Sequence, residues 1–167
     1  MLYNKNPHWL HHNTVNKGTL ISSSLNLQQV KLISHRGTSR SLNGSWFLFY
    51  LAKSDCHKLC HKNLHTIRQI TLALGKNRYR VKYGLILAIE KSLTSQAFIN
   101  KDLDLLYFTT SKLELKNFFS TLKIKNPTEG YYLADPFGKI ILYYPSKTSG
   151  EDIYQDLTRL LTISTTG

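Results

Sequence analysis

Residues 45–60 read SWFLFYLAKSDCHKLC, and this stretch decides the fold. Its first half is a continuous apolar and aromatic run, 46–52, which lies between Gly44 and Lys53. A run of this kind and length is typical of a strand buried in the middle of a sheet. The second half is polar and contains both cysteines of the chain. We therefore expect the cysteines directly after the end of a central strand.

A helix is predicted to follow this strand. Ser54 and Asp55 are both favourable helix N-caps. Apolar residues then recur at helical spacing as far as Leu74, and Gly75 is suited to end the helix. The cysteines are thereby expected at the helix N-terminus. The apolar positions of this pattern are Leu59, Leu64, Ile67, Ile70 and Leu74.

The remaining pattern predicts an α/β fold. Strand–helix alternation that ends in an antiparallel hairpin suits a mixed sheet flanked by helices, which is a thioredoxin-like architecture. We expect an extended N-terminal arm, 1–45, and a thioredoxin-like domain, 46–167. Short strands are expected within 16–21 and 27–34. Further elements are expected as strands at 79–89 and 103–109, a helix at 111–122, a hairpin at 130–144 with its turn at 135–138, and a helix at 150–164.

The charge of +12 is carried by the first half of the chain. Residues 1–89 contain thirteen Lys and Arg against one acid, whereas 90–167 contain nine of each sign. A one-sided field of this kind indicates an anionic surface nearby, either lipid headgroups or nucleic acid. The basic residues are scattered singly, without zinc-finger spacing or an aromatic RNA-binding motif, which disfavours nucleic acid.

No stretch of the sequence is long enough to span a bilayer. The longest apolar runs, 46–52 and 85–89, are far shorter than the roughly 20 residues that a transmembrane helix needs. No charged and then apolar signal segment opens the chain. The chain as it stands is therefore expected to be soluble.

Cys56 and Cys60 are separated by three residues, so on a helix they would lie on the same face. Such a pair can close a disulfide if the first turn adjusts, or hold one soft metal ion such as Cu(I) or zinc. A helix N-terminus lowers the pKa of a thiol, and nearby lysines would lower it further. Two buried cysteines can also serve only as apolar core residues, and the spacing alone leaves all three possibilities open.

Six of the seven histidines lie in or just after this stretch or within the first twelve residues. His57, His61 and His65 follow the cysteines, and solvent-facing positions on the helix are the simplest interpretation for them. His61 and His65 are nevertheless candidate metal ligands. The arm histidines could also reach the site, although no pattern requires it; they are His8, His11 and His12.

From Gly44 to Ile163 the chain resembles the SCO/SenC family of copper-handling, thioredoxin-fold proteins that assist cytochrome c oxidase assembly. The resemblance is carried by WFLFYLA, by CHKLC at the place of that family's CxxxC motif, and by YYLADPFGKIILYY, which matches its late strand–turn–strand. With GTLI and IRQITLALGKNRYRV added, the chain is similar to a group of small gammaproteobacterial SCO-like proteins that are usually membrane-anchored.

The resemblance implies copper held by Cys56 and Cys60, but the chain departs from the family at one ligand. The family's third ligand is a histidine just before the late hairpin, and this chain has no histidine after His65. The matching position falls at or beside Pro127, where thioredoxin-like redox proteins place a cis-proline next to their cysteine pair. The resemblance therefore also implies a dithiol–disulfide role, with Cys56 as the nucleophile and Cys60 as the resolving cysteine. A scaffold without chemistry is the third possibility.

Partners and location follow from the same resemblance. It implies an oxidase subunit or a copper-delivery protein as the partner, with the membrane surface close by. It also implies the periplasmic face of the inner membrane, with the anchor absent from this chain. If Met1 is the true start, a cytoplasmic protein with reduced thiols is expected instead.

Overall fold

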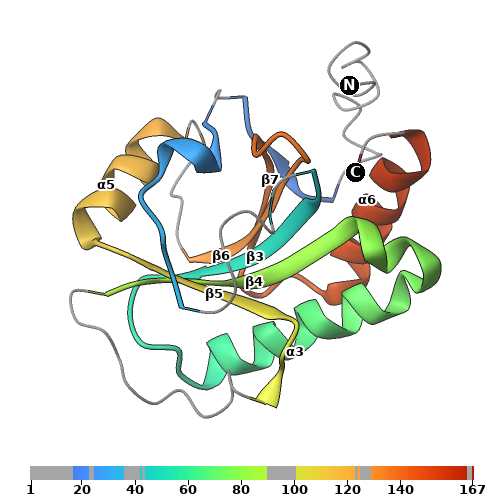
Figure 1. The fold of residues 1–167 in the computed structure, drawn as a ribbon, viewed down its shortest axis with the longest axis horizontal. Helices are drawn as coiled ribbons and strands as arrows, with labels where there is room; N and C mark the ends of the chain where they lie inside the picture. The colour runs from blue at the N-terminus through green and yellow to red at the C-terminus, as the bar shows by residue number, and fades with distance from the viewer. Residues whose placement is uncertain are drawn as a thin grey trace.

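The computed structural model describes residues 17–22, 25–35, 42, 44–89, 101–122, 124, 129–164 and 167. Within these ranges the chain forms a mixed sheet with helices on both faces (Figure 1). The strands are β1 (Thr19–Leu20), β2 (Ile33–Ser34), β3 (Trp46–Ala52), β4 (Val81–Ala88), β5 (Leu105–Thr110), β6 (Gly130–Ala134) and β7 (Ile140–Pro145). The helices are α3 (Lys58–Ala73), α5 (Lys112–Thr121) and α6 (Gly150–Ile163), with 3₁₀ turns η1 (Leu27–Gln29) and η3 (Gly75–Arg80).

The sheet has seven strands in the described part of the chain, in the order β1-β7-β6-β3-β4-β5-β2. Strands β3, β4 and β5 run parallel, so their carboxyl ends meet at one edge, and the start of α3 lies beside that edge (Figure 1). Strands β6 and β7 form an antiparallel hairpin on the other side of β3. The α/β thioredoxin-like fold with a mixed sheet is thereby confirmed.

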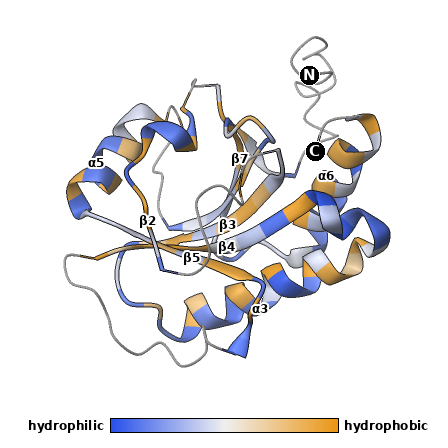
Figure 2. Ribbon diagram, in the orientation of Figure 1, coloured by the Kyte–Doolittle hydropathy of each residue, from blue (hydrophilic) through white to orange (hydrophobic). Residues whose placement is uncertain are grey.

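Every residue of β3 is buried, because the strand is central and both of its faces are covered. Helices α3 and α6 pack on one face, and α5 with the turn η1 packs on the other (Figure 1). The side chains of β3 alternate between the two resulting cores: Tyr50 belongs to the α3 side and Phe49 to the α5 side. Figure 2 shows the apolar strands between helices whose outer surfaces are polar.

Residues 19–20 and 33–34 lie at opposite edges of this sheet, whereas Leu25 to Leu27 hydrogen-bond with Gly138 to Ile140 at the start of β7. Strand β1 pairs with β7, and β2 pairs with β5, each over only two residues. Short pairings of this kind cover edge strands that would otherwise present unpaired backbone groups. The predicted strand at 27–34 was wrong for its first half, because the Asn26 side chain accepts a hydrogen bond from the backbone N–H of Gln28 and begins the turn η1 instead.

Arg80 joins the end of η3 to the end of α6. Its guanidinium donates to the backbone oxygens of Leu161 and Ser164, both at 2.8 Å, and to that of Gly167 at 2.9 Å. The last carbonyls of a helix have no partner within the helix, so this fork caps α6. Residues 79 and 80 belong to η3, so β4 begins at Val81 rather than at 79 as predicted.

Replacing Arg80 with lysine is expected to lower the free energy of unfolding by about 1–3 kcal/mol, because an ammonium group cannot reproduce the three-point fork. Urea denaturation of the purified protein measures this loss. Arg78→Lys is the matched control, since Arg78 is an exposed arginine of the same turn. Equal stability of Arg80→Lys and Arg78→Lys would contradict the capping role.

Within the described residues, no helix has the length and apolar character that are needed to cross a membrane.

Candidate redox and metal site at Cys56 and Cys60

Cys56 and Cys60 form a disulfide, with their Cα atoms 5.1 Å apart. Both are buried, at 5% and 3% exposure, in the core between the sheet and α3. The intervening residues His57 to Leu59 are exposed. The bond therefore lies just beneath the surface, at the carboxyl edge of the parallel strands.

The disulfide changes where the helix begins. We predicted N-caps at Ser54 or Asp55, but α3 begins at Lys58 with His57 as its N-cap, so Cys56 lies outside the helix. Residues four apart on a helix have Cβ atoms about 5–6 Å apart, whereas a disulfide needs them about 4 Å apart. The first cysteine must leave the helix for the bond to close. Cys60 stays in the first helical turn, where the helix dipole favours a thiolate.

A hydrogen-bonded carboxylate holds the loop that leads to the cysteines. The hydroxyl of Tyr50 donates to Oε2 of Glu129 at 2.8 Å, and the backbone N–H of Lys53 points to Oε1 at 3.4 Å. Burial, and then the bond to Glu129, raise the pKa of Tyr50, so this hydroxyl remains a donor. On α3, Asn63 donates to the backbone oxygen of Ser146 at 3.0 Å. These contacts tie the ends of β3, β6 and β7 to the helix.

Sequence reasoning missed Tyr50, Asn63 and Glu129 as parts of the site. Tyr50 has a local signal, because it lies in the apolar run only six residues before Cys56. Glu129 has none, since its approach to Tyr50 depends on the antiparallel pairing of β3 with β6.

The histidines of α3 do not join the cysteines. His61 and His65 are both exposed on the helix surface. Across the described ranges, no three His, Cys, Asp or Glu side chains lie together as a group that could hold a metal ion. The donor set that remains is the two sulfurs, which fit a soft ion such as Cu(I) only when the disulfide is reduced. Pro127 and the arm histidines lie outside the described residues; the latter are His8, His11 and His12.

The lysines near the pair have different surroundings. Lys58 and Lys62 are exposed on the first turns of α3. The ammonium group of Lys53 instead lies 5.5 Å from the ring centroid of Phe119, on the opposite face of the sheet. Lys53 is therefore directed toward α5.

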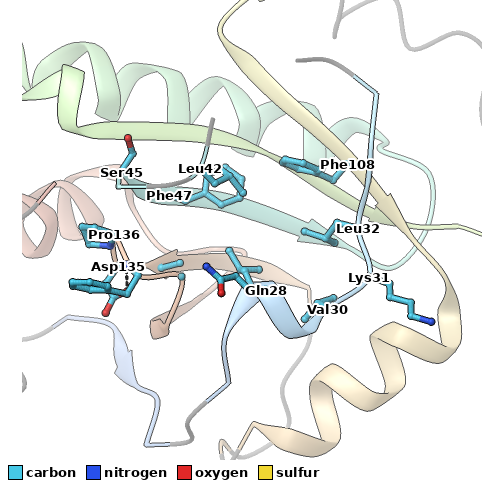
Figure 3. Close-up of a pocket in the computed structure, with 14 residues that line it drawn as sticks. Gln28, Val30, Lys31, Leu32, Leu42, Ser45, Phe47, Phe108, Asp135 and Pro136 are labelled. Atoms are coloured by element: carbon cyan, nitrogen blue, oxygen red, sulfur yellow. Dashed lines mark hydrogen bonds between the residues drawn. The ribbon is translucent and has the colours of Figure 1, made fainter. Parts of the chain in front are cut away.

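A cavity lies elsewhere, between η1 and the α5 face of the sheet (Figure 3). It encloses about 560 Å³. Phe47 and Phe108 form apolar walls, Gln28 borders it from η1, and the side chain of Lys31 extends away from it (Figure 3). The sheet separates this cavity from the cysteine pair.

Residues 46–164 match the family described as "Transmembrane-like, thioredoxin-like, C-terminal domain". This match covers most of the chain, including the cysteine pair, both parallel crossovers and the late hairpin. The sequence matches no curated protein.

Solved structures with the same fold include two kinds of protein. ScoI of Bradyrhizobium japonicum, solved with copper bound, has a TM-score of 0.54 at 18% identity, covering 85% of this chain and 98% of that one. BsSco, described as a member of the Sco family of cytochrome c oxidase assembly proteins with a disulfide switch, has a TM-score of 0.58 at 14% identity, covering 91% and 100%.

The second kind is the thioredoxin domain of a thiol-disulfide oxidoreductase from Bacteroides vulgatus, with a TM-score of 0.57 at 14% identity, covering 84% of this chain and 98% of that one. At these identities the likeness shows the fold and not the activity. The chain belongs to the transmembrane-like, thioredoxin-like C-terminal domain family, and its neighbours in fold include the Sco/SenC proteins.

Proposed function

We propose that this protein acts by thiol–disulfide exchange at Cys56 and Cys60, as a Sco-like factor in cytochrome c oxidase assembly. The observation that carries the proposal is the disulfide itself, at the carboxyl edge of the parallel strands of a thioredoxin-like sheet. Cys56 lies in a loop and can move without breaking α3, whereas Cys60 is fixed in the helix. This difference suits Cys56 to meet a partner and Cys60 to resolve.

In the reducing direction, the Cys56 thiolate attacks one sulfur of a partner disulfide, and the other partner sulfur leaves as a thiolate. Cys60 then loses its proton and attacks Cys56, which releases the second partner thiolate and forms the Cys56–Cys60 bond. Two electrons pass from the pair to the partner. In the oxidising direction Cys60 is the leaving group, and its place at the helix N-terminus stabilises the departing thiolate.

Copper is the second candidate, and the copper-bound state of a Sco protein of the same fold favours it. Reduction of the disulfide would supply two thiolates, which are ligands that Cu(I) prefers. His61, which directly follows Cys60, and His65, one helical turn later, are the histidines that we propose as a third ligand. Bound Cu(I) would make the protein a carrier of copper, while Cys56 and Cys60 would hold it.

The partner we propose is an oxidase subunit or a copper-delivery protein at the periplasmic face of the inner membrane. The concentration of positive charge in residues 1–89 supports a site beside anionic lipid headgroups.

The test uses the reduced full chain with Cys56→Ser and Cys60→Ser, which are matched because each lacks the disulfide. We expect glutathione disulfide to leave a stable mixed disulfide on Cys60→Ser, through Cys56, because the resolving thiol is missing. We expect Cys56→Ser to react about tenfold more slowly, since Cys60 is held in the helix. Intact-mass measurements over time follow both reactions.

Equal reactivity of the two variants would contradict the assigned roles, and a wild-type protein that never exchanges with glutathione would contradict the proposed function. A parallel anaerobic Cu(I) titration against a competing chelator tests the second candidate. One-to-one binding that both substitutions abolish would support a copper carrier. Binding no tighter than that of the variants would exclude a role in copper binding.

A further inference from the structure

One buried hydroxyl in the core cluster that contains the cysteine pair has no hydrogen-bond partner among the described residues. It belongs to Tyr107 on β5, whose side chain is 6% exposed. Leaving a buried hydroxyl unpaired costs about 1–3 kcal/mol, so such a group calls for a physical reason. Other tyrosines on the same face of the sheet donate to carboxylates: Tyr50 to Glu129, Tyr83 to Asp102 and Tyr144 to Asp156.

The sheet register places Tyr107 in the same transverse row as Tyr50. Tyr107 is opposite Leu85 on β4, and Leu85 is opposite Tyr50 on β3. All three residues belong to the buried cluster that contains Cys56 and Cys60. Tyr107 therefore lies on the face of the sheet that the disulfide packs against, and the carboxyl ends of β3 and β5 meet at one edge (Figure 1).

The surroundings of Tyr107 include the residue that directly precedes Cys56. Burial, and then the carboxylate of Asp55, raise the pKa of Tyr107, so the phenol remains protonated close to the residue that precedes Cys56. The His35 ring packs at 5.0 Å from the Tyr107 ring, and its Nε2 atom lies 2.7 Å from the hydroxyl oxygen of Thr109. Tyr107 thus contacts His35 on one side and belongs to the buried cluster that contains both cysteines.

We propose that the Tyr107 hydroxyl donates a hydrogen bond to the sulfur of Cys56 once the disulfide is opened. This inference rests on the proposed exchange function. A disulfide sulfur is a weak acceptor, which explains an unpaired hydroxyl in the oxidised form, whereas a thiolate accepts a strong, charge-assisted hydrogen bond. The hydroxyl thereby stabilises the reduced form and offsets the unfavourable charge of Asp55 beside a Cys56 thiolate.

The experiment measures the equilibrium of the full chain with glutathione, in which two glutathione molecules reduce the Cys56–Cys60 bond and become glutathione disulfide. Tyr107→Phe removes only the hydroxyl, and Tyr132→Phe is the control, because Tyr132 is equally buried on the opposite face of the sheet. We expect Tyr107→Phe to shift the equilibrium about tenfold toward the disulfide, which corresponds to a potential about 30 mV more negative. Tyr132→Phe is expected to leave the equilibrium unchanged.

Heat denaturation of the oxidised proteins distinguishes this role from a structural one, because loss of a structural hydrogen bond would lower the melting temperature. Tyr107→Phe is expected to keep or raise the melting temperature, because the hydroxyl that it removes is unpaired in the oxidised form. A wild-type equilibrium constant in Tyr107→Phe, or a lower melting temperature of its oxidised form, would overturn the inference. Failure of the proposed function is distinguishable, because the wild-type protein itself would then show no reversible reduction.

Discussion

Replacing Asp156 with asparagine is expected to destabilise the protein by about 3–5 kcal/mol, which lowers the melting temperature by roughly 10 °C. Asp156 on α6 is fully buried. Its carboxylate accepts hydrogen bonds from the backbone N–H groups of Lys17 and Gly18 at 2.9–3.0 Å and from the Tyr144 hydroxyl at 2.8 Å, and Arg159 lies 3.3 Å away. An amide group would place its own donors against these donors.

The substitution should also release the segment that leads into β1. Lys17 and Gly18 directly precede that strand, whose pairing with β7 is only two residues long, so the carboxylate holds the start of the segment in place. Limited trypsin digestion should therefore cleave after Lys17 faster in Asp156→Asn than in the wild type. Glu151→Gln makes the same change in charge at an exposed position of α6 and serves as the control. Wild-type stability of Asp156→Asn would show that the buried carboxylate is not needed.

The sequence predicted the elements whose burial has a local pattern. The run 46–52 is β3 with the predicted bounds, and the helix predicted at 150–164 is α6 with one residue fewer. The hairpin was confirmed with its turn, where Asp135 accepts backbone hydrogen bonds and Gly138 has a positive φ of 88°. In each case, burial follows from a continuous apolar run or from helical periodicity, and both are visible within about fifteen residues.

The features that the sequence did not predict depend on residues far apart in the chain. Short strands were expected within 16–21 and 27–34 and are found there as β1 and β2, but their places at the two edges of the sheet depend on pairing with β7 and β5. The start of α3 was predicted too early because the favourable caps were weighed without the bond between Cys56 and Cys60. A local cap contributes about 1 kcal/mol, which a covalent constraint on the same turn readily outweighs.

The candidate site likewise contains some residues that the sequence predicted and others that it did not. The cysteine pair was recognisable because a buried strand ends just before it. The tyrosines and acids around the pair were not, since the register of β3 with β4, β5 and β6 brings them together. An unpaired hydroxyl such as that of Tyr107 cannot be predicted from the residue type, because it depends on whether its neighbours in the fold provide a hydrogen-bond acceptor.

The same buried tyrosines predict a sharp loss of stability in alkaline solution. Burial raises the pKa of six tyrosines in the described part of the chain, that of Tyr131 to about 12; the others are Tyr50, Tyr83, Tyr107, Tyr132 and Tyr144. Their pKa in the unfolded chain is about 10. Their contribution to the stability of the fold is therefore complete below pH 10. It is lost as the pH rises, because the tyrosines of the unfolded chain ionise first.

Each such tyrosine lowers the free energy of unfolding by on the order of 1 kcal/mol per pH unit above 10, so six together lower it by roughly 6–8 kcal/mol per unit. A domain is stabilised by only about 5–15 kcal/mol in total, so cooperative unfolding is expected between about pH 11 and 12. Tyrosinate absorbance and circular dichroism, recorded together against pH, should show one shared transition.

The exposed Tyr79 supplies the internal control. Its hydrogen bond with Arg78, and then the charge of that arginine, lower its pKa, so it should ionise before the transition. Tyr79→Phe should remove that early part of the absorbance curve and leave the midpoint in place, since its side chain is 76% exposed. If tyrosinate instead forms gradually near pH 10 while the circular dichroism stays native, the buried tyrosines ionise within the fold. The buried phenols would then be open to solvent, and the unpaired hydroxyl of Tyr107 would have water as its partner.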